Sequence, residues 1–191
     1  MLGLCRLKLA SEPEEVRRRA DVRRADMRDF DLGREFSLVT LPFRSFQHLL
    51  TVADQLACLS RVREHLAPRG RLVLDVFNPS IAFLAREPSG DEAEPPFRMP
   101  DGRTVARICR VVSRDLFRQV QNVELVYDVE HPGGLKERVV HAFPMRYFFR
   151  FEVEHLLRRS GFALDAVHAD FAGNPYGSTY PGEMIFVARR E

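Results

Sequence analysis

The pattern of hydrophobic and polar residues is most informative at residues 70–79, Gly-Arg-Leu-Val-Leu-Asp-Val-Phe-Asn-Pro. A short apolar, β-rich run bounded by Gly and Pro predicts a strand buried on both faces. Strands of this kind occur in parallel sheets covered by helices, where ligands bind beyond the carboxyl ends of the strands. We therefore expect Asn78 and the loop after it to face a ligand crevice. For Asp75, a functional role and a purely structural role in a central strand are equally supported alternatives.

The segment before this strand predicts a βαβ unit. Residues 35–41 are apolar and end at Pro42, which predicts a strand. Thr51 and Asp54 then have the spacing of a capping box, with Asp in place of the usual Glu. The buried stripe of the helix that follows recurs every three or four residues, at Leu56, Leu59, Val62 and Leu66. Residues 67–70 are expected to end the helix and turn into the next strand, which makes a parallel, right-handed unit.

The pattern changes after residue 80. Residues 81–86 predict a helical turn, and residues 87–100, rich in Pro, Glu and Asp, predict a mobile loop. Alternating, β-branched segments then predict an antiparallel sheet added to the parallel one. These segments are residues 104–112, 120–130 and 135–143, and the last two are joined by a hairpin at 131–134.

The two ends of the chain complete the predicted elements. Residues 1–10 predict a helix and residues 21–25 a short strand. Near the C-terminus the pattern predicts a helix at 151–160 ended by Gly161, a strand at 162–168, a turn-rich loop at 172–178 and a last strand at 184–188.

Composition narrows the class of protein. A chain of 191 residues with 29% charged residues fits one ordinary globular domain. The net charge of +2 does not favour nucleic acid as a partner, and the arginines at 17–19, 23 and 24 are typical of a solvated helix face. Three widely separated cysteines, no signal peptide and no apolar run of membrane-spanning length predict a cytoplasmic protein without disulfides or membrane contact. The histidines other than His48 have no metal-ligand spacing, so we predict no metal site.

With these elements placed, the chain resembles class I S-adenosylmethionine-dependent methyltransferases. The resemblance lies in ordered segments over nearly the whole chain: Ala25-Asp-Met-Arg-Asp-Phe, Phe36-Ser-Leu-Val, Phe46-Gln-His-Leu-Leu, His65-Leu-Ala-Pro-Arg-Gly-Arg-Leu-Val-Leu-Asp and Leu156-Leu-Arg-Arg-Ser-Gly-Phe. It implies an α/β fold, a partial Rossmann-like methyltransferase sheet with a C-terminal β-hairpin and an added antiparallel β-sheet at residues 101–148. That insertion resembles those of small-molecule N-methyltransferases acting on amino sugars and glycine-type amines.

The chain also departs from the family. It contains no G-x-G and no P-loop, and residues 1–10 resemble the helix that follows the family's second strand. We therefore expect residues 1–191 to be a single, N-terminally truncated methyltransferase-like domain whose sheet has an open gap. Three outcomes remain open: the neighbouring strands close the gap, a second copy fills it in a homodimer, or the domain is marginally stable.

The resemblance implies roles for several residues. Asp26 would accept a hydrogen bond from the adenine amino group and Met27 would lie against the ring; the alternative for Asp26 is a turn acid. The cofactor region begins at Pro42, directly after the second predicted strand. In this region, Phe43 and Phe46 would wall the sulfonium or belong to the core. His48 would take a proton from the acceptor or serve as a local hydrogen-bonding residue.

The acceptor side is assigned by position alone, to Asn78, Arg146, Tyr147 and Tyr176. The first hypothesis is S-adenosylmethionine-dependent methyl transfer to a small-molecule acceptor, impaired in this truncated chain. The second is a non-catalytic methyltransferase remnant that acts as a self-associating interaction module. A nicotinamide dehydrogenase is disfavoured because the dinucleotide fingerprint is absent.

Overall fold

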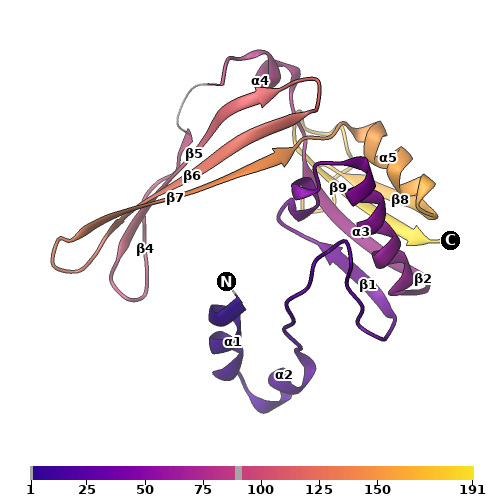
Figure 1. Cartoon of the computed structure of the whole chain (residues 1–191), viewed down its shortest axis with the longest axis horizontal. Helices are drawn as coiled ribbons and strands as arrows, with labels where there is room; N and C mark the ends of the chain where they lie inside the picture. Colours follow the sequence, from indigo (N-terminus) through magenta and orange to yellow (C-terminus); the bar gives the residue numbers. More distant parts are fainter. Residues whose placement is uncertain (1, 89–91) are drawn as a thin grey trace.

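The computed structural model describes residues 2–88 and 92–191. It has a four-stranded sheet with helices on one face, a second and longer antiparallel sheet that projects from it, and an N-terminal arm of short helices (Figure 1). Among the described residues, no helix has the length and apolar character needed to cross a membrane.

The four-stranded sheet confirms the predicted architecture. Its strands lie in the order β1 (Phe36–Leu41), β2 (Leu66–Phe77), β9 (Glu183–Arg190) and β8 (Phe162–His168). The pair β1 and β2 is parallel, whereas β9 runs antiparallel to both of its neighbours. The chain therefore forms the expected βαβ unit and the expected C-terminal hairpin, and β1 is an edge strand of the described sheet.

Strand β2 is central and buried, but it begins earlier than predicted. The prediction that residues 67–70 end the helix and turn is wrong, because the strand starts at Leu66 and continues through a register shift opposite β1. Arg69 adopts a left-handed conformation at this irregularity, with φ of 64°. Gly70 is required next to it, because a Cβ atom there would lie 2.8 Å from the carbonyl oxygen of Ala67.

Helices α3 (Val52–Glu64) and α5 (Arg150–Arg159) cover one face of this sheet (Figure 1). The predicted cap of α3 is confirmed, since Thr51 Oγ1 accepts a hydrogen bond from the backbone N–H of Asp54 at 3.1 Å. Gly161 ends α5 as predicted, with φ of 78°. The largest fully buried side chains of the chain include Phe46, Leu59, Leu72, Leu74, Phe148, Leu157, Phe162 and Phe186.

The second sheet consists mainly of β5 (Thr104–Asp115), β6 (Val120–Glu130) and β7 (Lys136–Arg146), all antiparallel as predicted. The prediction that residues 87–100 form only a mobile loop is wrong. Its described part contains β3 (Glu92–Ala93) and β4 (Phe97–Arg98), which pair with β5, while residues 89–91 lie outside the described residues. Two-residue strands are too short to show a period in the sequence. The predicted helical turn is confirmed as α4 (Ile81–Ala85).

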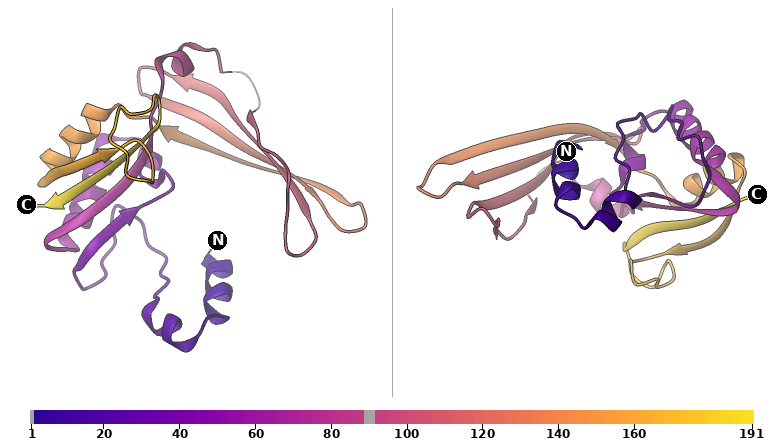
Figure 2. Two further views of the ribbon diagram at one scale, coloured as in Figure 1. Left: turned by 180° about the vertical axis from the view of Figure 1, so that it is seen from behind. Right: turned by 90° about the horizontal axis from the view of Figure 1, so that it is seen from below.

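The N-terminal arm comprises α1 (Leu2–Ala10) and α2 (Glu14–Arg19), neither of which has a buried residue. Figures 1 and 2 show α1 set off from the helix-covered sheet. The helix predicted at 1–10 is thus confirmed over its described residues, but the strand predicted at 21–25 is wrong. That segment is coil, since its side chains pair locally, as Arg23 does with Asp21 at 2.7 Å, and no described strand lies beside it.

One buried side chain joins the two sheets. Gln47 lies in the 3₁₀ helix η1 (Ser45–His48) and is fully buried. Its Oε1 accepts a hydrogen bond from the backbone N–H of Phe77 at 2.7 Å, and its Nε2 donates to the carbonyl oxygen of Arg146 at 2.6 Å. Because Phe77 ends β2 and Arg146 ends β7, this amide fixes the projecting sheet to the carboxyl end of the central strand.

Candidate functional site

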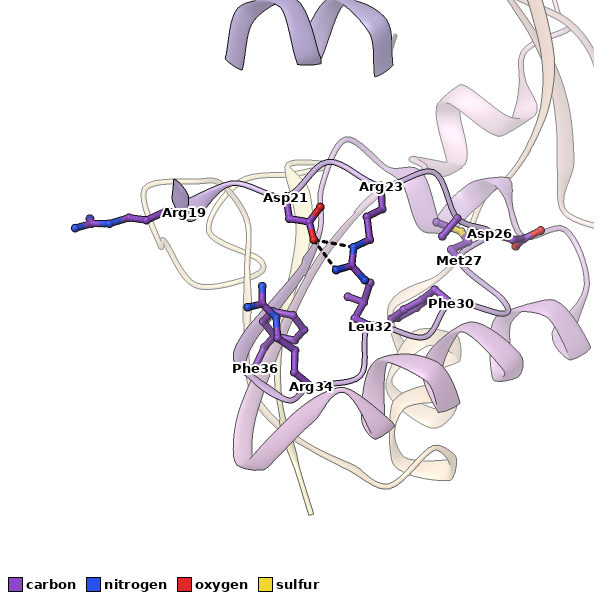
Figure 3. Close-up of a pocket in the computed structure, with 10 residues that line it drawn as sticks. Arg19, Asp21, Arg23, Asp26, Met27, Phe30, Leu32, Arg34 and Phe36 are labelled. Atoms are coloured by element: carbon purple, nitrogen blue, oxygen red, sulfur yellow. Dashed lines mark hydrogen bonds and ion pairs between the residues drawn. The ribbon is translucent and has the colours of Figure 1, made fainter. Parts of the chain in front are cut away.

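An open groove of about 490 Å³ lies beside β1, where the coil that follows the N-terminal arm passes it (Figure 3). We call it the first groove. It is lined by Arg19, Asp21, Arg23, Ala25, Asp26, Met27, Phe30, Leu32, Arg34 and Phe36. Two of the predicted cofactor residues, Asp26 and Met27, therefore lie in one groove. Figure 3 shows Met27 next to Phe30, with the Asp26 carboxylate directed away from the two apolar side chains.

Asp26 is held by a neighbouring arginine. The backbone N–H and the Nε of Arg28 donate to its Oδ1 at 2.9 and 3.0 Å, and Nη2 of Arg28 donates to its Oδ2 at 2.7 Å. These hydrogen bonds lower the pKa of the Asp26 carboxyl to about 2. Asp26 is therefore a carboxylate at neutral pH and acts only as a hydrogen-bond acceptor. Nη1 of Arg28 also donates to Oδ1 of Asp54 at 3.0 Å, which ties this segment to the start of α3.

The first groove is anchored by a histidine that the sequence analysis did not single out. His65 is buried at the C-terminal end of α3, and its Nε2 accepts a hydrogen bond from the backbone N–H of Leu32 at 2.9 Å. Its Nδ1 lies 2.7 Å from the carbonyl oxygen of Arg61, and its Nε2 also lies 3.3 Å from Oδ1 of Asp31. The ring of Phe30 lies 4.7 Å from that of His65, which fixes the apolar part of the groove.

The loop at the carboxyl end of β1 is strained and exposes an aromatic ring. Phe43 and Arg44 both have left-handed φ, 57° and 58°, and the Phe43 side chain is 92% exposed. The Arg44 backbone N–H donates to the buried carboxylate of Asp75 at 3.1 Å, and its Nη2 donates to both carboxylate oxygens of Glu183 at 2.9 and 3.2 Å. Left-handed non-glycine residues are retained where surrounding contacts hold them, often at functional sites. Pro42 precedes this pair and is exposed.

The two phenylalanines predicted to wall a sulfonium occupy different environments. Phe46 is 1% exposed and packs against Phe148 with ring centroids 5.6 Å apart, so it lies in the core. A place in the core was the alternative given for Phe46 in the sequence analysis. Phe43 is the one of the two that a ligand can reach.

His48 follows the buried Gln47 and faces the second sheet. Its ring is exposed and lies 5.1 Å from that of Phe143, which lies 5.1 Å from the ring of His141. Within the described residues, neither imidazole has a hydrogen-bonding partner in the protein. The ring nitrogens of His48 are therefore accessible, which a proton acceptor requires. The sequence analysis missed His141 and Phe143, because their proximity to His48 depends on how the sheets meet.

A second groove, of about 630 Å³, lies where the start of α3 meets the turn between β5 and β6. It is lined by Leu50, Thr51, Ser113, Arg114, Asp115, Phe117, Arg118, Val120, Asn122 and Arg146. The predicted acceptor residue Arg146 thus lines a groove. Its Nη2 donates to Glu152 at 2.7 Å and its Nη1 to the carbonyl oxygen of Leu50 at 3.2 Å.

The other three predicted acceptor residues line neither groove. Asn78 is buried, and its amide donates to the carbonyl oxygen of Pro181, which holds the last loop against the end of β2. Tyr147 is buried, and desolvation raises the pKa of its phenol. Tyr176 is half-buried beneath Arg150, whose guanidinium carbon lies 5.0 Å from its ring centroid.

Neither thiol nor metal chemistry is indicated at these grooves. Cys5, Cys58 and Cys109 are free cysteines in this structure. Burial, reinforced by the charge of Asp26, raises the pKa of the Cys58 thiol to about 12, which keeps it protonated. In the part of the chain that the structure describes, no group of three or more His, Cys, Asp and Glu residues is arranged to hold a metal ion.

The fold of the chain is similar to that of S-adenosylmethionine-dependent methyltransferases of known structure. The predicted α/β, Rossmann-like fold is confirmed. The whole chain matches the structure of the CcbJ methyltransferase from Streptomyces caelestis with a TM-score of 0.74, over 75% of that protein. At 23% identity this match shows the fold alone. No family model matches the chain.

Sequence similarity points to small-molecule N-methyltransferases. The chain is 28% identical over 158 residues to the dTDP-3-amino-3,4,6-trideoxy-alpha-D-glucopyranose N,N-dimethyltransferase of Streptomyces venezuelae, covering 83% of this chain and 62% of that protein. It is also 28% identical to the S-adenosylmethionine-bound amino pentose methyltransferase CalS10 of Micromonospora echinaspora, with a TM-score of 0.63 over 87% of this chain and 63% of CalS10. The chain thus spans somewhat less than two thirds of the length of these relatives.

Proposed function

We propose that the chain carries out S-adenosylmethionine-dependent methyl transfer to a small-molecule acceptor. The observation that supports it most is that Asp26 and Met27, the two residues that the resemblance relates to the adenine of the cofactor, both line the first groove beside β1. The similarity to amino-sugar N-methyltransferases supports an amine as the acceptor.

The residues of the first groove fit part of the cofactor. Met27 and Phe30 provide an apolar surface for the adenine ring, and the Asp26 carboxylate retains acceptor capacity for the adenine amino group. The groove volume of about 490 Å³ is that of a small-molecule site. The sequence contains no G-x-G for the rest of the cofactor, so we expect weak binding to this chain. When bound, S-adenosylmethionine supplies a methyl group attached to a sulfonium.

The chain's own residues then face the sulfonium and take up a proton. Phe43, held open on strained backbone by Arg44, presents an aromatic face that attracts a cation. His48 offers ring nitrogens without protein partners and accepts the proton that a methylated amine loses. The buried amide of Gln47 fixes η1, and with it His48, relative to both sheets.

Calorimetric titration with S-adenosylhomocysteine tests the cofactor part of this proposal. We expect measurable binding to the wild-type chain and about tenfold weaker binding to Asp26→Asn, because one charge-assisted hydrogen bond is lost. Asp29→Asn is the matched control, since Asp29 is exposed in the same segment but does not line the groove. Equal affinities of Asp26→Asn and Asp29→Asn would exclude the adenine role of Asp26. Failure of S-adenosylhomocysteine to bind would refute the function for this chain.

A second candidate function, a self-associating interaction module, is favoured by the edge of the first sheet. Strand β1 pairs on one side only within the described residues, and Leu38 on it is 53% exposed. Unpaired edge strands promote association with another chain. Sedimentation over a range of concentrations separates the two candidates. A concentration-dependent dimer that binds no S-adenosylhomocysteine would favour the module.

A further inference from the structure

The second groove carries an excess of positive charge. Three arginines from the second sheet line it, Arg114, Arg118 and Arg146, whereas Asp115 is the one acidic residue among its lining residues. Its volume of about 630 Å³ suits a small molecule. A ligand of this groove is therefore expected to carry negative charge.

The three arginines differ in how firmly they are held. Arg146 is only 14% exposed and pairs with Glu152, so its charge is largely compensated. Arg114 donates to the carbonyl oxygens of Leu84 and Arg86 at 2.9 and 3.0 Å, and no carboxylate among the described residues pairs with it. Its charge is thus fixed in place without an anionic partner.

Arg118 is the most available of the three. Its side chain is 83% exposed, and its ion pair with Asp115 is 3.3 Å long. An exposed pair of this kind contributes little free energy, so an incoming anion readily competes for the guanidinium. Planar guanidinium groups bind phosphate and carboxylate by paired hydrogen bonds.

An aromatic ring stands beside these charges with nothing packed on it. Phe117 is fully exposed in the turn between β5 and β6, and Leu50 and Val120 add apolar surface to the groove. Large apolar side chains gathered next to fixed charges indicate an interaction site. A flat ring is the ligand surface that an exposed phenylalanine stacks with best.

Hydrogen bonds connect this groove to the first one. Thr51, which lines the second groove, donates from Oγ1 to Oδ2 of Asp54 at 2.7 Å. Arg28 bridges the other oxygen of Asp54 to Asp26, which lines the first groove. The two grooves therefore lie on either side of the start of α3, with a continuous row of polar side chains between them.

We propose that the second groove is the acceptor site and selects a small molecule that carries a phosphate or carboxylate next to a flat ring. Its role as the acceptor site rests on the proposed function, whereas binding of such a molecule does not. Arg118 and Arg114 bind the anionic group, Phe117 stacks on the ring, and Thr51 lies toward the cofactor residues.

Calorimetric titrations at low ionic strength test this directly, with phenyl phosphate, benzoate and uncharged benzyl alcohol as probes. We expect saturable binding of at least one anion, weakened by added salt. Arg118→Gln should reduce its affinity about tenfold, the effect of losing one charge-assisted hydrogen bond. Phe117→Ala should also weaken binding. Both residues lie exposed in a turn, so neither substitution removes a core contact.

Arg103→Gln is the matched control, because Arg103 also pairs with an aspartate, Asp101, but does not line the groove. A preference for phenyl phosphate or for benzoate identifies which anion the groove selects. The proposal is overturned if neither anion saturates, if benzyl alcohol binds as well, or if Arg118→Gln and Arg103→Gln have equal effects. Failure of S-adenosylhomocysteine to bind, with phenyl phosphate or benzoate still bound, would refute the proposed function and leave the anion site standing.

Discussion

Replacing Gln47 by leucine removes a buried side chain that hydrogen-bonds to both sheets at their junction. The side chain is fully buried, so water cannot take its place beside the Phe77 N–H and the Arg146 carbonyl. A buried polar group left without a partner costs about 1–3 kcal/mol, and two such groups cost about 2–5 kcal/mol after partial compensation by the apolar side chain. An ordinary domain has a net stability of about 5–15 kcal/mol, so this loss is a large fraction of the total.

Gln55→Leu is the matched control. Gln55 is also fully buried in the same core, but its Nε2 donates to the carbonyl oxygen of Leu49 at 2.8 Å, and its Oε1 has no partner among the described residues. Removing that orphaned oxygen offsets part of the cost, so we expect a loss of only about 1 kcal/mol. Urea unfolding of both variants measures the difference. If Gln47→Leu destabilises the protein no more than Gln55→Leu does, the amide does not join the two sheets as described.

Three further predictions concern the first groove and the thiols. His65→Ala should lower the free energy of unfolding by about 2–3 kcal/mol in urea titrations, because the Leu32 N–H loses its acceptor; an unchanged midpoint would show that water replaces the imidazole. The pKa of the Asp26 carboxyl is lowered, so its stabilising contribution is fully present above the ordinary value of 3.8 and is lost as the pH falls toward about 2. Melting temperatures of wild type and Asp26→Asn should therefore differ at neutral pH and converge over that range, and a constant difference would contradict the assignment. A thiol reagent should modify exposed Cys5 rapidly and leave Cys58, with a pKa of about 12, unmodified in the folded protein; mass spectrometry after partial labelling checks this order.

Elements with strong local signals could be predicted from the sequence, and those that depend on tertiary contacts could not. The capped helix α3 and the apolar strand β2 carry their own periodicity and turn residues. Residues 21–25 contain only Val22 and Ala25 as apolar residues, and a strand also needs a neighbour to pair with, which no described strand provides there.

The candidate site likewise contains residues that a local sequence pattern identifies and residues that only tertiary contacts bring together. Asp26 and Met27 were placed together because they are adjacent in a segment that resembles a known family. The second groove joins Thr51 to Arg118, which are distant in the chain and carry no shared pattern. In the sequence, His65 and Gln47 are ordinary polar residues near a helix. Their structural roles are evident only from their burial and their hydrogen bonds to backbone groups.

Because the projecting sheet is attached at the Gln47 junction, the displacement caused by a rotation there grows with distance along its strands. Strands β6 and β7 are 11 residues long, and at about 3.3 Å per residue they reach about 35 Å from the junction to the hairpin at 131–134 (Figure 1). A rotation of about 5° at the junction moves that far tip by about 3 Å over such a length. The second groove lies at the pivot, against Val120 and Arg146, the residues where β6 begins and β7 ends. A given rotation at the junction therefore displaces the far hairpin much more than it displaces the residues that line the second groove.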